Sequence, residues 1–281
     1  MLRASIGGWH IPQLVSLYSL VPGMTHSSIP DHCRLIIEPA PLTGSWNMAV
    51  DEALLESAAE NGLCSLRWYR WDQPTISLGY FQNNETKDQN ETWKGLPRVR
   101  RLSGGGAILH HHELTYSFAV PANHPLSQSP PDLYLTIHQP LIDVLATHDL
   151  QVAFRGVSFK AESEPFLCFG RGDERDLVYQ GNKVLGSAQR RRRGAIVQHG
   201  SLLLLTSKYA SHFPGLLNQL EQTSLYQEDF LSQLAKEFSQ AIAQAIKLPL
   251  ESQKLTDEEL GQARQLEKEK YSREFWTSRK K

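Results

Sequence analysis

VRRLSGGGAILHHHELTYSFAV, residues 99–120, places three consecutive glycines between runs of strand-forming residues. These runs predict strands over 98–101, 107–110 and 113–120, with the glycines in a loop between the first two. Glycine has no Cβ, so a ligand could lie directly against the backbone N–H groups of such a loop. A flexible turn that binds nothing is the alternative interpretation of the same glycines.

Strand and helix signals alternate upstream of this stretch. We expect a strand at 34–38, a helix from the cap residues 43–45 to Asn61-Gly62, and strands at 66–71 and 75–80 joined as a hairpin by a turn at 72–74. The polar stretch 83–96 connects this region to the glycine loop, and for it both coil and helix stay open.

Downstream of the loop, helices become more frequent. We expect a helix from Pro130-Pro131 toward His148 that Pro140 kinks or divides, strands at 176–179, 183–189 and 195–205 with a hairpin turn at Gly181-Asn182, an amphipathic helix at 229–246, and a capped helix from Thr256 to about Tyr271. The pattern predicts an α/β (α+β) fold with mixed, largely antiparallel sheets flanked by helices. We divide the chain into an N-terminal extension (1–31), a catalytic domain (32–213) and a helical C-terminal segment (214–281).

The composition is that of an ordinary globular protein. Of 281 residues, 40% are hydrophobic and 21% charged, and the net charge is −1, which argues against a generic nucleic-acid-binding protein. No stretch approaches the roughly 18 uncharged apolar residues of a membrane-spanning helix. Cys33, Cys64 and Cys168 lie far apart and are odd in number, which disfavours a disulfide framework, and the lack of CxxC spacing disfavours a structural zinc site. We expect a protein of the reducing cytoplasm, with Met24 as an alternative start that would make 1–23 an upstream extension.

Charged residues flank the glycine loop on both sides. Arg100 and Arg101 precede it and could hold a carboxylate or a phosphate. Three histidines at 110–112 suggest a metal site, but side chains on a strand alternate, so at most two of them converge. A catalytic zinc usually needs three protein ligands. We therefore expect no metal, and we expect His110 to be packed in the core or to line a substrate site.

A second stretch of interest begins at the hairpin turn that precedes Lys183. The small residues Gly186-Ser187-Ala188 follow and would let a ligand approach the chain closely. The ammonium of Lys183 either points into a partly buried site or is solvated. Four arginines at 190–193 form either a solvated turn or a docking edge for an acidic protein partner.

The chain resembles the biotin/lipoate A/B protein ligase family in four ordered blocks. These blocks are NMAVDEALL (47–55), RWYRWDQPTISLGYFQ (67–82), VRRLSGGGAILHHHELTYSF (99–118) and GNKVLGSAQRRRRGAIVQHGSLLL (181–204), and the tail KYSREFWTSRK (270–280) is also similar to the end of family members. The resemblance implies an α/β catalytic domain. It also implies that the domain attaches medium-chain or lipoyl acyl groups to a lysine of small carrier domains.

Two chemistries occur among the proteins that the chain resembles. Lipoate–protein ligases activate a free acid with ATP as an acyl-adenylate, whereas octanoyltransferases take the acyl group from acyl carrier protein through a cysteine thioester. The octanoyltransferase cysteine stands in a CF segment shortly before the GxKxxGSAQ block, where this chain has Cys168-Phe169. The spacer GRGDERD (170–176) is more charged than is usual for octanoyltransferases and is similar to a ligase element. The ligase therefore stays as an alternative.

The resemblance thus implies an octanoyltransferase of the cysteine-dependent branch. Cys168 is the expected nucleophile and Lys183 its electrostatic partner. The expected substrate-binding residues are Arg101, Ser103, Gly104, Gly105, Gly106, Ala107, His110, Gly186, Ser187, Ala188 and Gln189. The expected donor is acyl carrier protein and the acceptor a lipoyl domain or glycine-cleavage H protein, with no nucleic acid and no membrane involved. No cofactor is expected, or ATP and Mg for the ligase alternative, and an inactive carrier-binding module is a weaker alternative.

Overall fold

An eight-stranded sheet dominates the fold, in the order β11-β1-β2-β6-β10-β9-β8-β7. The computed structural model describes residues 29–83, 91–157, 166–170, 172–218 and 228–279. The strands of the large sheet are β1 (Cys33–Ile37), β2 (Ser65–Tyr69), β6 (Glu113–Val120), β7 (Ala153–Phe154), β8 (Leu177–Tyr179), β9 (Asn182–Arg192), β10 (Ala195–Leu203) and β11 (Leu250–Ser252). A three-stranded sheet in the order β4-β3-β5 consists of β3 (Thr75–Leu78), β4 (Arg98–Arg100) and β5 (Ile108–His110). Antiparallel pairs predominate in the large sheet, with β1 parallel to both neighbours, which confirms the expected mixed α/β fold.

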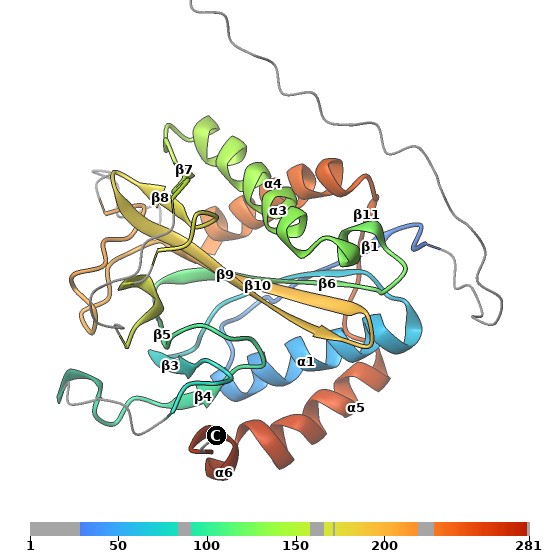
Figure 1. Ribbon diagram of the computed structural model, residues 1–281, viewed down its shortest axis with the longest axis horizontal. Coiled ribbons are helices and arrows are strands. Elements are labelled where there is room, and N and C mark those ends of the chain that lie inside the picture. The colour runs from blue at the N-terminus through green and yellow to red at the C-terminus, as the bar shows by residue number, and fades with distance from the viewer. Residues whose placement is uncertain (1–28, 84–90, 158–165, 171, 219–227, 280–281) are drawn as a thin grey trace, which may run out of the picture.

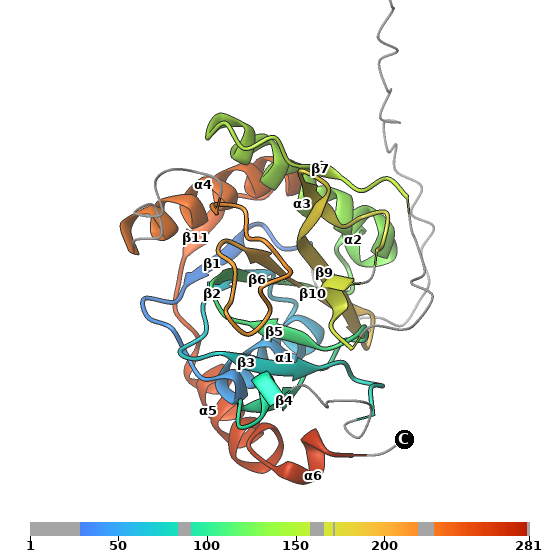
Figure 2. The same ribbon diagram turned by 90° about the vertical axis from the view of Figure 1, so that its left-hand side faces the viewer.

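Helices cover both faces of the large sheet (Figures 1 and 2). They are α1 (Gly44–Asn61), α2 (Pro125–Gln128), α3 (Pro130–Thr147), α4 (Glu228–Ile246), α5 (Asp257–Leu266) and α6 (Glu274–Thr277), with short turns η1 (Glu91–Trp93), η2 (Cys168–Gly170) and the π-helical η4 (Glu267–Tyr271). On one face lie α3 and α4, and on the other lies α1, with α5 packed on its outer side. The small sheet lies on the α1 side of the large sheet (Figure 2).

Helix α1 begins and ends at the residues that the sequence predicts. The Thr43 hydroxyl accepts a hydrogen bond from Trp46 N at 3.3 Å, and Gly62 ends the helix with φ +69°. Nearly every side chain up to Ala58 is buried, because the sheet covers one side of α1 and α5 covers the other. This confinement fixes the helix firmly beneath the sheet.

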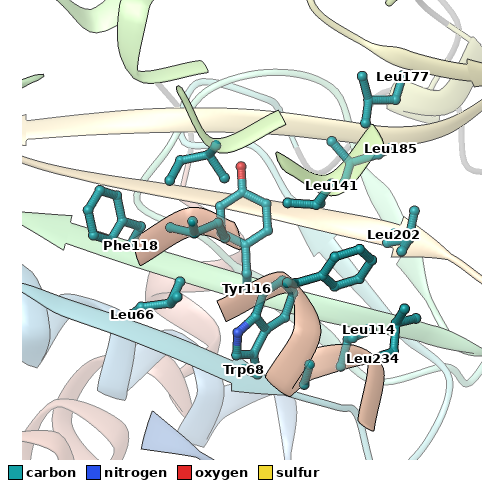
Figure 3. Close-up of a cluster of buried hydrophobic side chains, with 14 of the residues drawn as sticks. Leu66, Trp68, Leu114, Tyr116, Phe118, Leu141, Leu177, Leu185, Leu202 and Leu234 are labelled. Carbon is teal, nitrogen blue, oxygen red and sulfur yellow. The ribbon is translucent and has the colours of Figure 1, made fainter. Parts of the chain in front are cut away.

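The larger apolar core fills the space between the sheet and the pair α3–α4 (Figure 3). Trp68 of β2 stacks on Phe238 of α4 with ring centroids 5.5 Å apart, and Tyr116 of β6 lies 5.8 Å from Trp68 on its other side. Leucines such as Leu141 and Leu185 surround these rings. Burial of each such side chain stabilises the fold by about 1.5–3 kcal/mol.

The predicted hairpin of 66–71 and 75–80 is wrong. The two strands belong to different sheets: β2 lies between β1 and β6, whereas β3 lies between β4 and β5. Trp71 forms a bridge with Leu42, so the chain leaves the large sheet there before the turn. A strand pattern in the sequence predicts that a strand is present but not which strand it pairs with. Strand β2 is fully buried, as expected for a strand with neighbours on both edges.

Two smaller expectations are also corrected, and the open question about 83–96 is answered in part. Helix α3 continues undivided through Pro140, because packing of its buried face offsets the loss of one backbone hydrogen bond. The turn before Lys183 lies at Gln180 and Gly181, both with positive φ, and Asn182 already belongs to β9. The stretch 83–96 contains the single turn η1, and 84–90 lies outside the described residues.

The C-terminal segment is helical and also packs on both faces of the sheet. Its strand β11 pairs with β1, Phe238 of α4 is buried in the larger core, and Ala263 of α5 is buried against α1. We propose that residue 214 marks a change in composition within one folding unit. None of the helices in the described ranges combines the length and apolar character needed to cross a bilayer. Of the expected N-terminal extension, residues 1–28 lie outside the described residues.

A chain that ends at residue 213 is therefore expected not to fold. Loss of α4 would expose the apolar face of α3 and Trp68, because Leu234 and Phe238 cover them in the full chain. We expect an insoluble protein, or one with no cooperative thermal transition when its ellipticity is followed. A sharp transition near that of the full chain would show instead that 32–213 folds on its own.

Candidate active site

A largely apolar pocket lies between the α1 side of the large sheet and the small sheet, with about 550 Å³ of empty space. Its lining comprises Met48, Tyr69, Trp71, Arg101, Gly104, Gly105, Ile108, His110, Thr115, Cys168, Phe169, Lys183, Gly186, Ser187, Ala188, His199, Gly200 and Ser201. Here we call it the reactive cavity, because it holds a thiol and an ammonium group among apolar walls. Segments from six regions of the chain meet around it.

Cys168 lies against the glycine loop because the two segments bond to each other. Cys168 N donates to Ala107 O at 2.6 Å, and Ala107 N donates to Phe166 O at 2.9 Å. A Cβ atom placed on Gly105 would lie 3.7 Å from Cys168 Sγ, and Gly105 has φ +88°. The sulfur is thus held next to bare backbone that only glycine adopts without strain.

Lys183 lines the same cavity from β9. Its Nζ lies 2.9 Å from Asp176 Oδ1 and 5.6 Å from the ring centroid of Phe169, the residue after Cys168. Burial raises the pKa of Asp176 above its ordinary value, and the Lys183 charge partly offsets this. The side chain of Lys183 folds over Gly186, where a Cβ would lie 2.8 Å from Nζ. A glycine at 186 therefore leaves room for the ammonium.

Most of the residues predicted for the site meet at this cavity. Arg101, Gly104, Gly105, His110, Cys168, Lys183, Gly186, Ser187 and Ala188 line it, whereas Ser103, Gly106, Ala107 and Gln189 do not. Gln189 instead donates to Pro130 O and Gln198 Oε1. The hydroxyl of Ser187 is engaged by Tyr116 and His138, at 2.8 and 2.7 Å.

The two arginines before the loop, which could hold a carboxylate or a phosphate, donate to main-chain carbonyls in this structure. The Arg101 guanidinium donates to the carbonyls of Ser77, Gly104 and Gly106 at 2.6–2.9 Å. That of Arg100 donates to several further main-chain carbonyls, including Gly79 O at 2.8 Å and Thr277 O at 2.6 Å. These bonds fix the shape of the loop and join it to the small sheet and to the C-terminal end.

The lipoyl protein ligase A/B catalytic domain family matches residues 43–255. The chain belongs to this family. An octanoyltransferase LipM from Brevibacillus brevis is 33% identical over 275 residues, covering 88% of this chain and 99% of the relative. Another from Carboxydothermus hydrogenoformans is 40% identical over 179 residues, covering 62% and 63%.

Solved structures of lipoate ligases share the fold of this family member. The putative lipoate protein ligase Ta0514 from T. acidophilum with bound lipoic acid superposes with a TM-score of 0.71 at 21% identity, covering 88% of this chain and 99% of that one. A bipartite lipoate protein ligase from Thermoplasma acidophilum, described with its E2 lipoyl domain, gives a TM-score of 0.64 at 21% identity, covering 88% and 96%. At this identity the likeness concerns the fold.

The histidine run that suggested a metal is held by other contacts. His110 Nδ1 donates to Glu113 at 2.6 Å, its Nε2 accepts from Ser77 at 2.7 Å, and its ring stacks on Trp71 at 3.7 Å. Burial lowers the pKa of His110 below its ordinary value. In the described ranges, no three His, Cys, Asp or Glu side chains gather as a metal site would require. His110 is thus a packed wall of the cavity.

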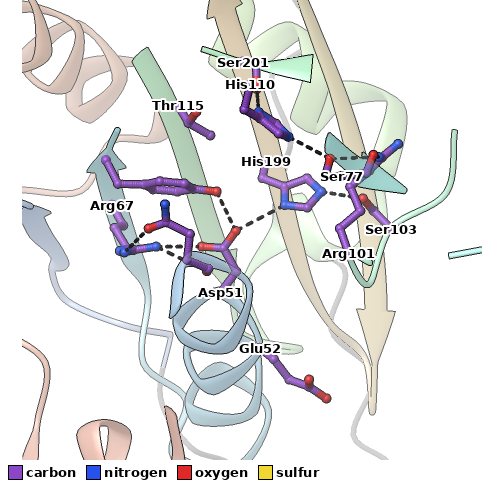
Figure 4. Close-up of polar contacts among 12 residues, drawn as sticks. Asp51, Glu52, Arg67, Ser77, Arg101, Ser103, His110, Thr115, His199 and Ser201 are labelled. Atoms are coloured by element: carbon purple, nitrogen blue, oxygen red, sulfur yellow. Dashed lines mark hydrogen bonds and ion pairs between the residues drawn. The ribbon is translucent and has the colours of Figure 1, made fainter. Parts of the chain in front are cut away.

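Asp51 and His199 form a buried polar chain that sequence reasoning missed (Figure 4). Asp51 accepts from Tyr69 Oη at 2.9 Å and from Arg67 and His199 Nδ1 at 3.2 Å each, and His199 Nε2 contacts the hydroxyl of Ser103. Burial alone would raise the pKa of Asp51, but the His199 hydrogen bond and the Arg67 charge outweigh it, and the pKa is lowered. This carboxylate holds His199 against the glycine loop. The only sequence signal was that both residues lie in family blocks.

The arginine run at 190–193 is mostly engaged within the chain. Arg192 pairs with Glu52 at 3.0 Å, and both Arg192 and Arg193 contact Glu56 of α1. The carboxylates of α1 therefore partly neutralise these charges, for which the sequence leaves both a solvated turn and a docking edge open. These contacts tie the β9–β10 turn to that helix.

Substitution of Gly105 by alanine is expected to slow acylation of the enzyme about tenfold or more. An alanine at φ +88° costs about 1–2 kcal/mol, and its Cβ would lie 3.1 Å from the Arg101 Nη2 that holds the loop. Gly95→Ala is the matched control, since Gly95 has φ +85° and open space around its Cβ position. Rates of acyl-enzyme formation and melting temperatures separate the two. Equal activity loss in both variants would show that backbone strain alone matters.

Proposed function

We propose that this family member is an octanoyltransferase that moves an octanoyl group from acyl carrier protein to a lysine of a lipoyl domain or glycine-cleavage H protein. The observation that carries this proposal is the thiol of Cys168, which lies in the same apolar cavity as the Lys183 ammonium. Full-length relatives named octanoyltransferase support it further. A free-acid ligase needs no thiol at this position.

In the first step, the Cys168 thiolate attacks the thioester carbonyl of the donor. A new S–C bond forms, and the donor thiol leaves with the proton taken up from solvent. Little activation is needed beyond deprotonation, because the attacking and leaving groups are both thiols. The positive charge of the Lys183 ammonium stabilises the Cys168 thiolate. Backbone N–H groups of the glycine loop beside Cys168 stabilise the oxyanion that forms on the acyl carbonyl. Asp176 holds the ammonium in place at 2.9 Å.

In the second step, the ε-amine of the acceptor lysine attacks the acyl-enzyme. A C–N bond forms, the S–C bond to Cys168 breaks, and the thiol is regenerated as the amine loses its proton. The apolar walls formed by Met48, Trp71 and Ile108 hold the acyl chain during both steps. We place the reaction in the reducing cytoplasm, which keeps the thiol available.

No cofactor takes part in this scheme, whereas the ligase alternative requires ATP and Mg. The guanidinium groups of Arg100 and Arg101 donate to carbonyls, so they are poorly placed to receive the phosphates of a nucleotide at the loop. This engagement favours transfer over ligation.

Incubation with octanoyl-acyl carrier protein and no nucleotide tests the function. We expect the intact mass of the enzyme to increase by one octanoyl group, and this group to pass to an added lipoyl domain. Carrier modification that requires ATP and free octanoate supports the ligase instead. Binding of the carrier domain without turnover in either assay supports the inactive binding module.

Lys183→Met is expected to slow acyl-enzyme formation about 10²-fold, the cost of removing one electrostatic donor from such a site. Methionine keeps the length of the apolar stem but leaves the buried Asp176 carboxylate without its Lys183 partner, so the melting temperature is measured together with the rate. Lys94→Met removes an exposed lysine of the same charge, far from the cavity lining, and should react like the wild type. Single-turnover rates measured by mass spectrometry decide the matter. Equal rates for the two variants would remove Lys183 from the mechanism.

A further inference from the structure

A second, smaller cavity lies directly behind Phe169. It is narrow, with room for about one water molecule, and is lined mainly by apolar side chains, among them Leu109, Leu203, Ala210 and Phe213. Among the described residues, Phe169 alone belongs to the linings of both this cavity and the reactive cavity. Its ring therefore stands between the two spaces.

The position of Phe169 is set from both sides. It follows Cys168 in the turn η2, and its ring centroid lies 5.6 Å from Lys183 Nζ. On the other side the ring lies 5.9 Å from the ring of Phe213, which belongs to the second cavity. The Phe169 ring thus lies between the second cavity and the reactive cavity, which holds the Cys168 thiol and the Lys183 ammonium.

The second cavity suits hydrocarbon. Its one polar side chain is Ser207, whose hydroxyl bonds to His111 Nδ1 at 2.9 Å and to Tyr209 N at 3.2 Å, so it does not need a ligand partner. An apolar cavity of this kind takes apolar groups in preference to water. With the Phe169 ring in place, the second cavity and the reactive cavity are separate.

The reactive cavity is closed by side chains away from the thiol. Met48, Tyr69 and Trp71 are all less than 10% exposed, and each is held in the core of the α1 side. An acyl chain attached to Cys168 therefore has only a limited apolar space to occupy. A longer chain would need additional space close to the sulfur, and the nearest is the space behind Phe169.

We propose that the Phe169 ring sets the upper limit of acyl chain length: without it, the space that the ring occupies would join the small apolar cavity to the reactive cavity and take the distal carbons of a longer fatty acyl group. This inference rests on the proposed octanoyl transfer. It assigns a specificity role to a residue that touches no reacting atom.

Competition among acyl donors tests the role of Phe169. Wild-type enzyme and Phe169→Ala are each given an equimolar mixture of octanoyl, decanoyl, dodecanoyl and tetradecanoyl thioesters of one acyl carrier protein, and the acyl-enzymes are counted by intact mass. We expect the dodecanoyl-to-octanoyl ratio to rise at least tenfold in Phe169→Ala, because each buried methylene group adds to binding. Phe169→Leu should shift the ratio in the same direction by less, and it serves if the alanine variant melts early.

Leu203→Ala provides the matched control. Leu203 lines the second cavity and not the reactive cavity, so the change enlarges the second cavity while the Phe169 ring and the neighbouring Phe213 ring are kept, and the ratio should stay at the wild-type value. An unchanged ratio in Phe169→Ala or Phe169→Leu, or an equal rise in Leu203→Ala, would overturn the proposal. Failure of the wild type to acquire any acyl group would count against the proposed function and not against the role of Phe169.

Discussion

Cys168→Ser is expected to abolish octanoylation of the enzyme and to lower transfer to a lipoyl domain by at least about 10³-fold. A serine hydroxyl stays protonated near neutral pH, whereas a thiol supplies thiolate, which is the attacking species. Oxygen is smaller than sulfur, so the substitution introduces no steric clash. The melting temperature should therefore hardly change while the mass increase disappears.

Cys64→Ala is the matched control for this experiment. Cys64 lies beside Cys33 at the junction of β1 and β2, outside the lining of the reactive cavity. A hydrogen bond with Cys33, together with burial, raises the pKa of Cys64 well above its ordinary value, so this thiol stays protonated. The control should acquire the octanoyl group at the wild-type rate. If Cys168→Ser still modified the carrier with ATP and free octanoate, the ligase reaction would be the correct assignment.

Local signals in the sequence predict helix ends well. Thr256 and Glu259 form the expected capping box, with the Glu259 carboxylate accepting from Thr256 N at 2.9 Å and the Thr256 hydroxyl accepting from Glu259 N at 3.1 Å. Thr43 and Gly62 likewise bound α1 as expected. These signals work because all the interacting groups lie within one turn of the chain.

Long-range pairing could not be predicted in the same way. The alternation of residue types shows where β2 and β3 lie along the chain. It does not show which strands they pair with, because a central strand differs from a hairpin strand mainly in being buried on both faces, and the sequence indicates this only weakly. Likewise, nothing near Asp51 indicates that His199, 148 residues away, will donate to it. The partners of charged side chains depend on which elements the sheet order brings together.

The candidate site could be predicted further than the fold around it, because family motifs carry information about distant residues. Cys168 and Lys183 were expected to share a site, and they line one cavity. The motif did not reveal the roles of individual groups in the loop. From the sequence, Arg101 could equally have bound an anion. Its N–H groups donate to the carbonyls of Gly104 and Gly106 because the folded loop places those carbonyls within hydrogen-bond distance.

Glu259→Ala is expected to destabilise the fold by about 3–5 kcal/mol, because it leaves the buried Arg34 charge without its partner. Arg34 and Glu259 are each 2% exposed, and the two guanidinium–carboxylate bonds between β1 and α5 measure 3.0 and 2.5 Å. Chemical unfolding gives the free energy. The double variant Arg34→Met with Glu259→Met removes both charges and should recover much of the loss. A double variant as unstable as Glu259→Ala would show that the lost packing matters more than the unpaired charge.

The effect of Glu259→Ala should also depend on pH. Burial alone would raise the pKa of Glu259, but hydrogen bonds from Arg34 and from Thr256 N, with the Arg34 charge, outweigh it, so the pKa is lowered in the folded protein. A carboxylate with a lowered folded pKa adds stability above its unfolded value, about 4.3, and this stability is lost as pH falls through the folded value. The difference in unfolding free energy between wild type and variant should therefore be full at pH 7 and shrink below about pH 4. A difference that stays constant from pH 7 to pH 3 would mean that the ionised carboxylate contributes nothing beyond its volume.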